Sequence, residues 1–390
     1  MQFHILSFEG PDAYARAGGI ASRVDGLVQA LVAAGHPTHL WFVGDPARPG
    51  YEHHGQLHLH RWCQWISRYH PMGVYDGEEG KERDFSASLP PFLIEHHLAP
   101  ALAAGERAVV LAEEWHTAHA VLHLEWLLRQ RGMDERVAVF WNANNVFGFE
   151  RIDWPKLARA ATLTTVSRYM RQRMWGQGID PLVIPNGLGA EAYTPAPSRH
   201  VRELERLVRG RSVLAKVARW DPDKRWLNAI DIVAELRRLG WRPLLIARGG
   251  SEAHGWEVLS RAHSLGLRVG ERTVPKPGAP GLLSALGDAD NLDVMVLQSH
   301  LDPGARRLLF RGAHAVLANS SHEPFGLVGL EAMAAGGVAC TGCTGEDYVV
   351  PGRNALVLQT DDPREFVAQF ARLRNDDVVN SQIRRAARRT

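Results

Sequence analysis

Alternation of strand and helix patterns constrains the fold of this chain more than any other feature. Short apolar segments such as Thr38–Val43 and Val213–Val217 alternate with amphipathic stretches such as Lys224–Leu239. Apolar strands separated by helices are typical of parallel sheets that are covered on both faces. The alternation runs once through each half of the chain. We therefore predict an α/β protein with two doubly wound domains that face each other across a deep cleft.

The pattern predicts the following strands and helices. The expected strands are Phe3–Phe8, Thr38–Val43, Leu57–His60, Ala108–Ala112, Val137–Trp141, Leu163–Val166, Leu182–Ile184, Val213–Val217, Leu244–Ala247, Leu292–Leu297, Ala315–Ala318 and Val338–Thr341. The expected helices are Ser22–Ala34, Lys224–Leu239, Glu257–Leu265 and Gly326–Ala335. The segment Trp62–Pro91 has no clear period, which predicts an ordered insertion or a loop.

A proline-rich polar stretch, Tyr193–Ser198, separates the two halves and has the composition of a linker. The length of 390 residues also fits two domains better than one or three. We expect an N-terminal domain over residues 1–195 and a C-terminal domain over residues 196–390.

Charge and composition exclude several classes of protein. The 45 basic and 43 acidic side chains nearly cancel, to a formal net charge of +2, which argues against a dedicated nucleic-acid or polybasic membrane binder. No apolar run approaches the roughly 20 residues of a transmembrane helix. The chain enters a strand at once, without a signal-like segment, and three cysteines cannot form a disulfide framework. A cytoplasmic protein is expected, of unspecified oligomeric state and without nucleic-acid or integral membrane association.

The segment Asn319–Met333 carries the strongest chemical signal. It follows a short strand, and a helix is expected to begin near Pro324 and Gly326. The backbone amides of Gly326 and Leu327 would then lie at a helix N-terminus, which attracts anions. Glu331 would lie on the buried helix face, where a carboxylate needs a partner such as a ligand hydroxyl or a structural arginine.

This segment, E-P-F-G-L-V-G-L-E-A-M, resembles the signature of retaining glycosyltransferases of the GT-B fold, the glycogen-synthase-like group (glycosyl transferases group 1). Further matches follow in the family's order along the chain. These are Arg16–Ile20, Glu113–Thr117, Trp141–Asn145, Val166–Ser167, Ile184–Gly187 and Ala218–Lys224. The resemblance implies two Rossmann-like domains and covers nearly the whole chain.

The resemblance also implies roles in binding a nucleoside-diphosphate sugar, which is a substrate, with no cofactor or metal. Arg219 and Lys224 would hold the diphosphate through charge-assisted hydrogen bonds, whereas a surface pair with Asp221 or Asp223 is the plainer alternative. Glu323, with the backbone of Phe325, Gly326 and Leu327, would contact the sugar, and Glu331 the ribose. Gly18 and Gly19 would let backbone amides approach the diphosphate, and Arg16 would add a positive charge.

The acceptor side departs from the family pattern. Glu113 and Asn144 stand where the family has histidines, while His116 matches the family's second histidine. Glu113 and Glu114 are adjacent and are expected on opposite faces of a strand end, so they would not form a glycosidase pair. Trp115 and Trp141 are expected at strand ends, where they could stack on a sugar.

Two further clusters are weaker. His53, His54, His58 and His60 lie close in sequence without a cysteine or carboxylate at ligand spacing, so no metal site is expected. Cys340 and Cys343 form a C-x-x-C in a small-residue loop rather than at a helix start, which does not favour redox or zinc chemistry.

The sequence thus predicts a retaining, metal-independent hexosyltransferase that moves a sugar, with glucose expected, to a hydroxyl of a glucan, another saccharide or a small acceptor. Arg219, Lys224 and Glu323 are the expected catalytic residues. The alternatives are a GT-B phosphorylase, a GT-B epimerase, and a non-catalytic glycan- or nucleotide-binding protein.

Overall fold

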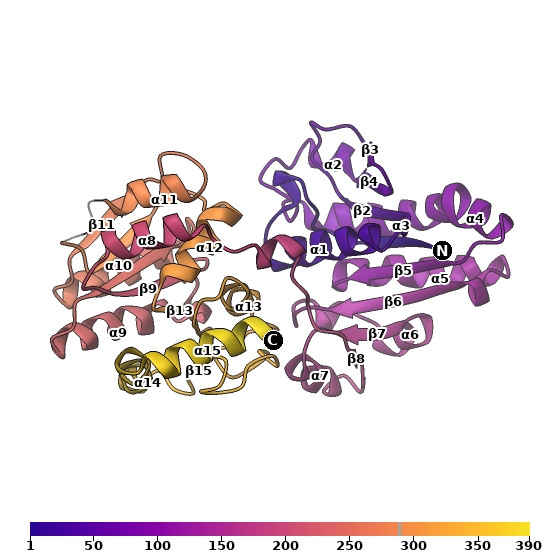
Figure 1. Cartoon of the computed structure of the whole chain (residues 1–390). Coiled ribbons are helices and arrows are strands. Elements are labelled where there is room, and N and C mark those ends of the chain that lie inside the picture. Colours follow the sequence, from indigo (N-terminus) through magenta and orange to yellow (C-terminus); the bar gives the residue numbers. More distant parts are fainter. Residues whose placement is uncertain (288, 290) are drawn as a thin grey trace. The chain divides into compact units, whose positions relative to one another are not determined.

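The computed structural model describes residues 1–287, 289 and 291–390. The chain divides into two compact units, Met1–Gly189 and Ala190–Thr390. Each unit is built on its own sheet (Figure 1).

The N-terminal unit contains an eight-stranded sheet in the order β3-β4-β2-β1-β5-β6-β7-β8. All neighbouring strands are parallel except β3 and β4. The strands are β1 (Gln2–Leu6), β2 (Thr38–Val43), β3 (Tyr51–His54), β4 (Leu57–Trp62), β5 (Ala108–Glu113), β6 (Val137–Ala143), β7 (Thr162–Thr165) and β8 (Leu182–Val183). Because the strand order reverses between β1 and β5, their carboxyl ends flank the place where ligands bind in such sheets.

Helices cover both faces of this sheet. They are α1 (Gly19–Ala33), α2 (Gln64–Ser67), α3 (Glu78–Leu93), α4 (Ala99–Ala103), α5 (Ala118–Gln130), α6 (Trp154–Ala160) and α7 (Arg168–Trp175), with a π-helix, η2 (Ile94–Leu98). Short 3₁₀ turns are η1 (Ala13–Ala15), η3 (Trp115–Thr117), η4 (Asp134–Arg136) and η5 (Phe149–Arg151). Val24 and Val28 of α1 pack in one cluster with Leu40 of β2. On the opposite face, Trp41 contacts His97 of η2.

The C-terminal unit contains a seven-stranded parallel sheet in the order β11-β12-β10-β9-β13-β14-β15. Its strands are β9 (Ser212–Val217), β10 (Pro243–Arg248), β11 (Val269–Arg272), β12 (Val294–Leu297), β13 (Ala315–Ala318), β14 (Ala339–Thr341) and β15 (Leu356–Val357). The strand order reverses between β9 and β13, so their carboxyl ends again flank the expected ligand position.

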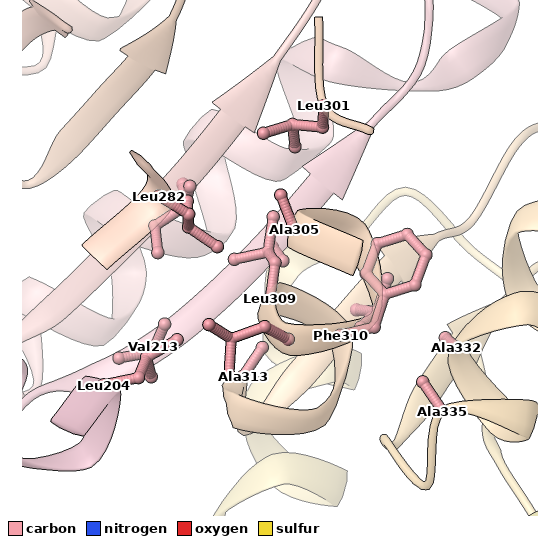
Figure 2. Packing of buried hydrophobic residues seen from close by; sticks show 14 of the residues in the cluster. Leu204, Val213, Leu282, Leu301, Ala305, Leu309, Phe310, Ala313, Ala332 and Ala335 are labelled. Carbon is pink, nitrogen blue, oxygen red and sulfur yellow. The ribbon is translucent and has the colours of Figure 1, made fainter. Parts of the chain in front are cut away.

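Helices also cover both faces of the second sheet. They are α8 (Ser198–Leu207), α9 (Trp226–Arg238), α10 (His254–Ser264), α11 (Ala279–Leu286), α12 (Pro303–Gly312), α13 (Leu327–Ala334), α14 (Pro363–Asn375) and α15 (Asp377–Arg389), with short turns η6 (Ala190–Tyr193) and η7 (Pro222–Lys224). Figure 2 shows Leu204 of α8, Leu282 of α11 and Leu309 of α12 in one of the two buried clusters. Val213 of β9 joins this cluster, whereas the next residue, Leu214, joins the other one. The sheet is therefore buried on both faces, as the apolar strands predict.

The segment Trp62–Pro91 is ordered, which agrees with one of the two expected alternatives, an ordered insertion, and not with a loop. It contains α2 and most of the sixteen-residue helix α3, which includes Pro90 and Pro91. Prolines are usually helix breakers, and they hide the helical pattern at this place. The sequence analysis also missed β3, β11 and β15 and the helices α4, α5, α6, α7, α8, α11, α12 and α14. Within the described residues, no helix is long and apolar enough to cross a membrane.

Candidate functional site

The candidate residues of the C-terminal unit follow β9 and β13, the two strands at which the strand order reverses. Lys224 ends the turn η7 after β9, and Glu323 lies in the loop between β13 and α13. The Lys224 Nζ donates to Glu323 Oε2 at 2.9 Å. An ion pair therefore joins the two loops, and both side chains keep about a fifth of their surface exposed, 21% and 23%.

Arg219 lies in the same loop as Lys224 but is much more open. Its side chain is 66% exposed, and its nearest carboxylate is that of Asp221, at 3.9 Å. Lys224 is likewise 4.0 Å from Asp223. Both distances are long for ion pairs, as in the surface pairs with Asp221 or Asp223 that the sequence analysis named as the alternative. The Arg219 guanidinium nevertheless stays accessible to an anion.

The loop before α13 has the conformation that the sequence indicates. Gly326 precedes the helix with a φ of +83°, a value that favours glycine. A Cβ atom there would lie 2.7 Å from Glu346 Cγ. Phe325 is buried, and Leu327 is the first residue of α13. The first amides of α13 have no acceptor within the helix, so this end can receive an anionic or hydroxyl-rich group.

A second loop, after β14, fixes the position of Glu323. Thr344 Oγ1 accepts a hydrogen bond from the Glu323 amide at 2.8 Å. A Cβ atom at Gly345 would lie 2.2 Å from the carbonyl oxygens of both Glu323 and Pro324. The two loops are thus in direct backbone contact, which only a glycine at position 345 allows.

Glu346 belongs to the same loop and was missed by the sequence analysis. It is buried, and its Oε2 accepts from the Thr344 amide at 3.0 Å. Burial raises the pKa of this carboxyl to about 7, and the charge of Glu323 acts in the same direction. The available signal is the acidic residue at the end of Gly342–Glu346, shortly after the C-x-x-C of Cys340 and Cys343.

Glu331 lies on the inner side of α13. Its Oε1 is 3.2 Å from an Arg306 guanidinium nitrogen. Its Oε2 is buried and has no hydrogen-bond partner in the part of the chain that the structure describes. Burial raises the pKa of this carboxyl, and Arg306 opposes the rise. A structural arginine is therefore present, but it satisfies one of the two oxygens.

Lys216 is a buried lysine in β9 that no spacing argument could find. Its Nζ donates to the Leu317 carbonyl at 3.1 Å and to Asn319 Oδ1 at 2.9 Å. Asn319 in turn donates to Asn228 at 2.9 Å. Burial lowers the pKa of Lys216 to about 7. This hydrogen-bonded chain holds β9, β13 and α9 together beneath the Lys224–Glu323 pair.

In the N-terminal unit, the loop after β1 contains Arg16, Gly18 and Gly19. The Gly18 amide donates to Glu9 Oε2 at 2.9 Å, so this amide is already paired with a buried carboxylate. Glu9 also accepts from the Ala21 amide at 3.0 Å and so caps α1. Arg16 is largely exposed and 3.4 Å from Asp25. It lines a cavity of about 350 Å³.

Glu113, at the end of β5, is enclosed by polar partners. Arg23 Nε lies 3.1 Å from each of its oxygens. The side-chain amides of Asn142 and Asn144 donate to its Oε2 at 2.9 and 2.7 Å. Because Glu113 is 1% exposed, these hydrogen bonds take up most of the acceptor capacity of its carboxylate. The side chain of Asn144 therefore points to Glu113.

Glu114 differs from the expectation of an extended strand end. Its backbone has φ 68° and ψ 167°, a region that is essentially restricted to glycine. Its Oε1 accepts from the Asn144 amide at 2.6 Å. The expectation of an extended backbone at Glu114 is therefore wrong, and Asn144 contacts both acids, Glu113 through its side-chain amide and Glu114 through its backbone amide. Burial raises the pKa of Glu114 to about 8.

Three aromatic residues, His116, Trp115 and Trp141, lie after β5 or in β6. His116 Nε2 is 2.7 Å from Glu78 Oε1, and its Nδ1 is buried without a partner among the described residues. Trp115 is 9% exposed and stacks on His116 at 3.9 Å. Trp141 is fully buried and donates to the Glu114 carbonyl. The expectation that Trp141 stacks on a sugar is therefore wrong.

Comparisons with known proteins agree with these features. Residues 288–390 match the profile of the family "Glycosyl transferases group 1". A glycogen synthase of Thermus thermophilus is 26% identical over 415 residues, covering 93% of this chain and 90% of that protein.

Two solved structures share the fold over the full chain. Sucrose-phosphate synthase from Thermosynechococcus elongatus has a TM-score of 0.69 at 17% identity, covering 100% of this chain and 94% of that one. The catalytic domain of starch synthase IV from Arabidopsis thaliana, bound to ADP and acarbose, has a TM-score of 0.71 at 14% identity, covering 100% and 95%. The two Rossmann-like units therefore form the GT-B fold. The chain is thus similar to the group 1 glycosyltransferases, whose profile matches its residues 288–390, and to a glycogen synthase along nearly its whole length.

Proposed function

We propose that this protein is a glycosyltransferase that moves a hexose, glucose in the first instance, from a nucleoside-diphosphate sugar to an acceptor hydroxyl with retention of the anomeric configuration. One observation carries the proposal. Lys224 and Glu323 form an ion pair across the two loops where the strand order reverses, directly before the N-terminus of α13. Such a position at the carboxyl ends of parallel strands is where nucleotides bind in doubly wound sheets.

We assign the binding of the nucleoside to Glu331. Its Oε2 is buried and unpartnered within the described part of the chain, so it can accept hydrogen bonds from the two ribose hydroxyls. A charged acceptor binds a hydroxyl more strongly than a neutral one does. The donor is thus proposed to lie on the C-terminal unit.

The diphosphate is assigned to Arg219 and Lys224. When the donor binds, Lys224 exchanges part of its contact with Glu323 for the phosphate, and Glu323 becomes free to accept from the sugar hydroxyls. The amides of Gly326 and Leu327 complete the sugar contact. Arg16 is proposed to add positive charge, whereas the expected approach of the Gly18 amide to the diphosphate is not retained, because this amide already donates to Glu9.

Fixed cations explain how the leaving group is stabilised. As the bond between the anomeric carbon and the phosphate oxygen breaks, charge grows on the diphosphate, and Arg219 and Lys224 stabilise it. The acceptor oxygen forms its bond on the same face, and its proton passes to the departing phosphate. A double displacement is the alternative route. We propose that no divalent metal takes part, because protein side chains supply the positive charge.

The acceptor is assigned to the N-terminal unit, with His116 as its polar contact. Glu113 and Asn144 are proposed to act by holding the end of β5 and β6 in place, because they bind each other and Arg23. The cavity beside Arg16 offers further space on this unit.

A screen of sugar nucleotides tests the proposal. Each donor is incubated with the protein, and release of free nucleoside diphosphate is measured, first with water and then with saccharide acceptors. Lys224→Ala serves as the inactive control. We expect turnover with at least one donor and a product of retained anomeric configuration.

Other outcomes would favour the alternatives. Nucleotide binding without release from any sugar would indicate a non-catalytic binding protein. Interconversion of two sugar nucleotides would indicate an epimerase, and activity only with a sugar 1-phosphate would indicate a phosphorylase. An inverted product would refute the retaining mechanism.

A further inference from the structure

Five histidines gather on one face of the N-terminal sheet, opposite α1. In the register of β1, β2 and β4, His4 lies beside His39, and His39 lies beside His58. His60 lies two residues further along β4, beside Trp41. The local sequence cluster around position 58 showed two of these residues, whereas His4 and His39 reach this face only through the sheet.

The π-helix η2 supplies the fifth histidine. His97 lies with its ring centroid 4.9 Å from that of His39 and 5.2 Å from that of His60, nearly perpendicular to both. A π-helix is rare and is often found at functional positions. Its wider turn here brings His97 over the sheet face, while the neighbouring His96 stays exposed.

Three of the five histidines have ring nitrogens that converge. One nitrogen of each of His39, His60 and His97 lies within 4.8 Å of the others. Within this set, His39 Nδ1 and His60 Nε2 are 3.0 Å apart.

The other two histidines have ring nitrogens that are already engaged. His4 uses both of its nitrogens, with Gln2 at 3.1 Å and with the Trp41 indole at 3.3 Å. His58 Nδ1 is 2.8 Å from the Tyr51 hydroxyl. The converging set is therefore His39, His60 and His97.

The chemistry of these side chains suits a metal. Neutral imidazole is the common ligand of zinc and related transition metals, through either ring nitrogen. Three imidazole nitrogens that converge from two strands and a π-helix therefore make a candidate metal site.

We propose that His39, His60 and His97 form a zinc site that fastens η2 to the N-terminal sheet. Around tetrahedral zinc, ligand nitrogens are roughly 3.4 Å apart. His39 Nδ1 and His60 Nε2 form a hydrogen bond with each other at 3.0 Å. The ion would replace this hydrogen bond, with the proton moved to the other nitrogen of its ring. The ion would lie on the His97 side of this pair, and each ring must turn its lone pair toward it. Three histidines leave the fourth position for water.

The site is separate from the proposed reaction. Its residues lie along β2 and β4 and in η2 rather than in the loops that were assigned to donor or acceptor. The ion is expected to stabilise the fold, since a ligand that binds the native state raises the free energy of unfolding.

Metal titration of the full-length protein tests the proposal. The protein is treated with EDTA, separated from the chelator, and titrated with ZnCl₂ by calorimetry and with CoCl₂ by visible absorption. We expect one ion per chain, tetrahedral cobalt bands, and a higher melting temperature with zinc. His97→Ala should weaken zinc binding by about 100-fold or more. The matched control is His96→Ala in the same π-helix, which should bind zinc as the wild type does.

Two results would overturn the site. Unchanged zinc affinity in a His97→Ala variant that melts like the metal-free wild type would mean that the imidazoles only pack against one another. Loss of binding in His53→Ala/His54→Ala, which changes two exposed residues of β3, would mean that zinc binds the surface. If His97→Ala does not fold, His97→Gln replaces it, because it keeps a polar side chain at this half-buried position.

Discussion

Glu331 places a carboxylate oxygen in the interior with nothing described to bind it, which is costly in the absence of a ligand. Glu331→Gln keeps the shape and removes the charge. We expect nucleoside-diphosphate affinity to fall by roughly 1–3 kcal/mol, because hydrogen bonds from the ribose lose their charge assistance. The melting temperature without nucleotide should stay equal or rise. Calorimetric affinity and melting temperature are measured on the same preparation.

The opposite pattern would exclude the ribose role. If Glu331→Gln melts lower while its nucleotide affinity is unchanged, the carboxylate serves Arg306 and the fold alone. Arg306→Lys is a useful companion variant, because it keeps the charge next to Glu331 while changing the geometry of the pair.

Glu114 predicts a pH dependence of stability. Its pKa is raised in the fold, from 4.5 to about 8, so between these values the native state binds more protons than the unfolded state. Stability must then fall as the pH rises through this window. Glu114→Gln removes the titration and should flatten the decline between about pH 5 and pH 8, by an amount on the order of a few kcal/mol. The measurement is the free energy of urea unfolding of both proteins across this pH range. Parallel curves of unfolding free energy against pH would contradict the prediction.

At the scale of elements, the loop after β9 carries the proposed phosphate contacts. Arg219→Ala or Lys224→Ala should lower turnover by about 10²–10³, the usual loss for one preorganised donor. For Arg219→Ala, stability should change by under about 1 kcal/mol, because the pair of Arg219 with Asp221 is long and exposed. Arg238→Ala on α9 is the control, since this arginine is exposed and paired with Glu235 on its own helix. A variant that keeps more than about a third of the wild-type rate has no part in the mechanism.

The elements that the sequence predicted best are those with the strongest pattern. Thr38–Val43 and Ala315–Ala318 match β2 and β13 residue for residue, because strands in the middle of a covered sheet are apolar on both faces. α3 was lost because Pro90 and Pro91 interrupt its pattern. α8 was missed although its buried residues, Val201 and Leu204, are three positions apart, because half of its residues are charged.

The sequence predicted those parts of the site whose residues lie close together along the chain. The Glu323–Glu331 segment and the Arg219–Lys224 loop are contiguous motifs, and their elements were anticipated, whereas their roles stay predictions. Lys216 and the His39–His60–His97 set depend on which strands are neighbours. No spacing in the sequence contains that information, because parallel strands are joined by long crossovers.

At the scale of the whole molecule, the two units share one plan, with the proposed chemistry at carboxyl strand ends and the proposed zinc on a sheet face. Activity in excess EDTA should persist if Arg219 and Lys224 supply the charge that a metal would supply, as proposed. The same treatment should lower the melting temperature by removing zinc. Turnover and melting are followed together, and a complete, magnesium-reversible loss of turnover would refute the metal-independent mechanism.

The contact between Gly345 and the carbonyl oxygens of Glu323 and Pro324 has a consequence for engineering the enzyme. Libraries that vary residue 345 alone should yield mostly inactive variants rather than variants with a new donor, because any side chain there displaces the carboxylate that is proposed to contact the sugar. A change of donor preference would instead need paired substitutions in both loops. Selection for new sugars should therefore recover double changes in 323–326 and 343–346 far more often than single ones.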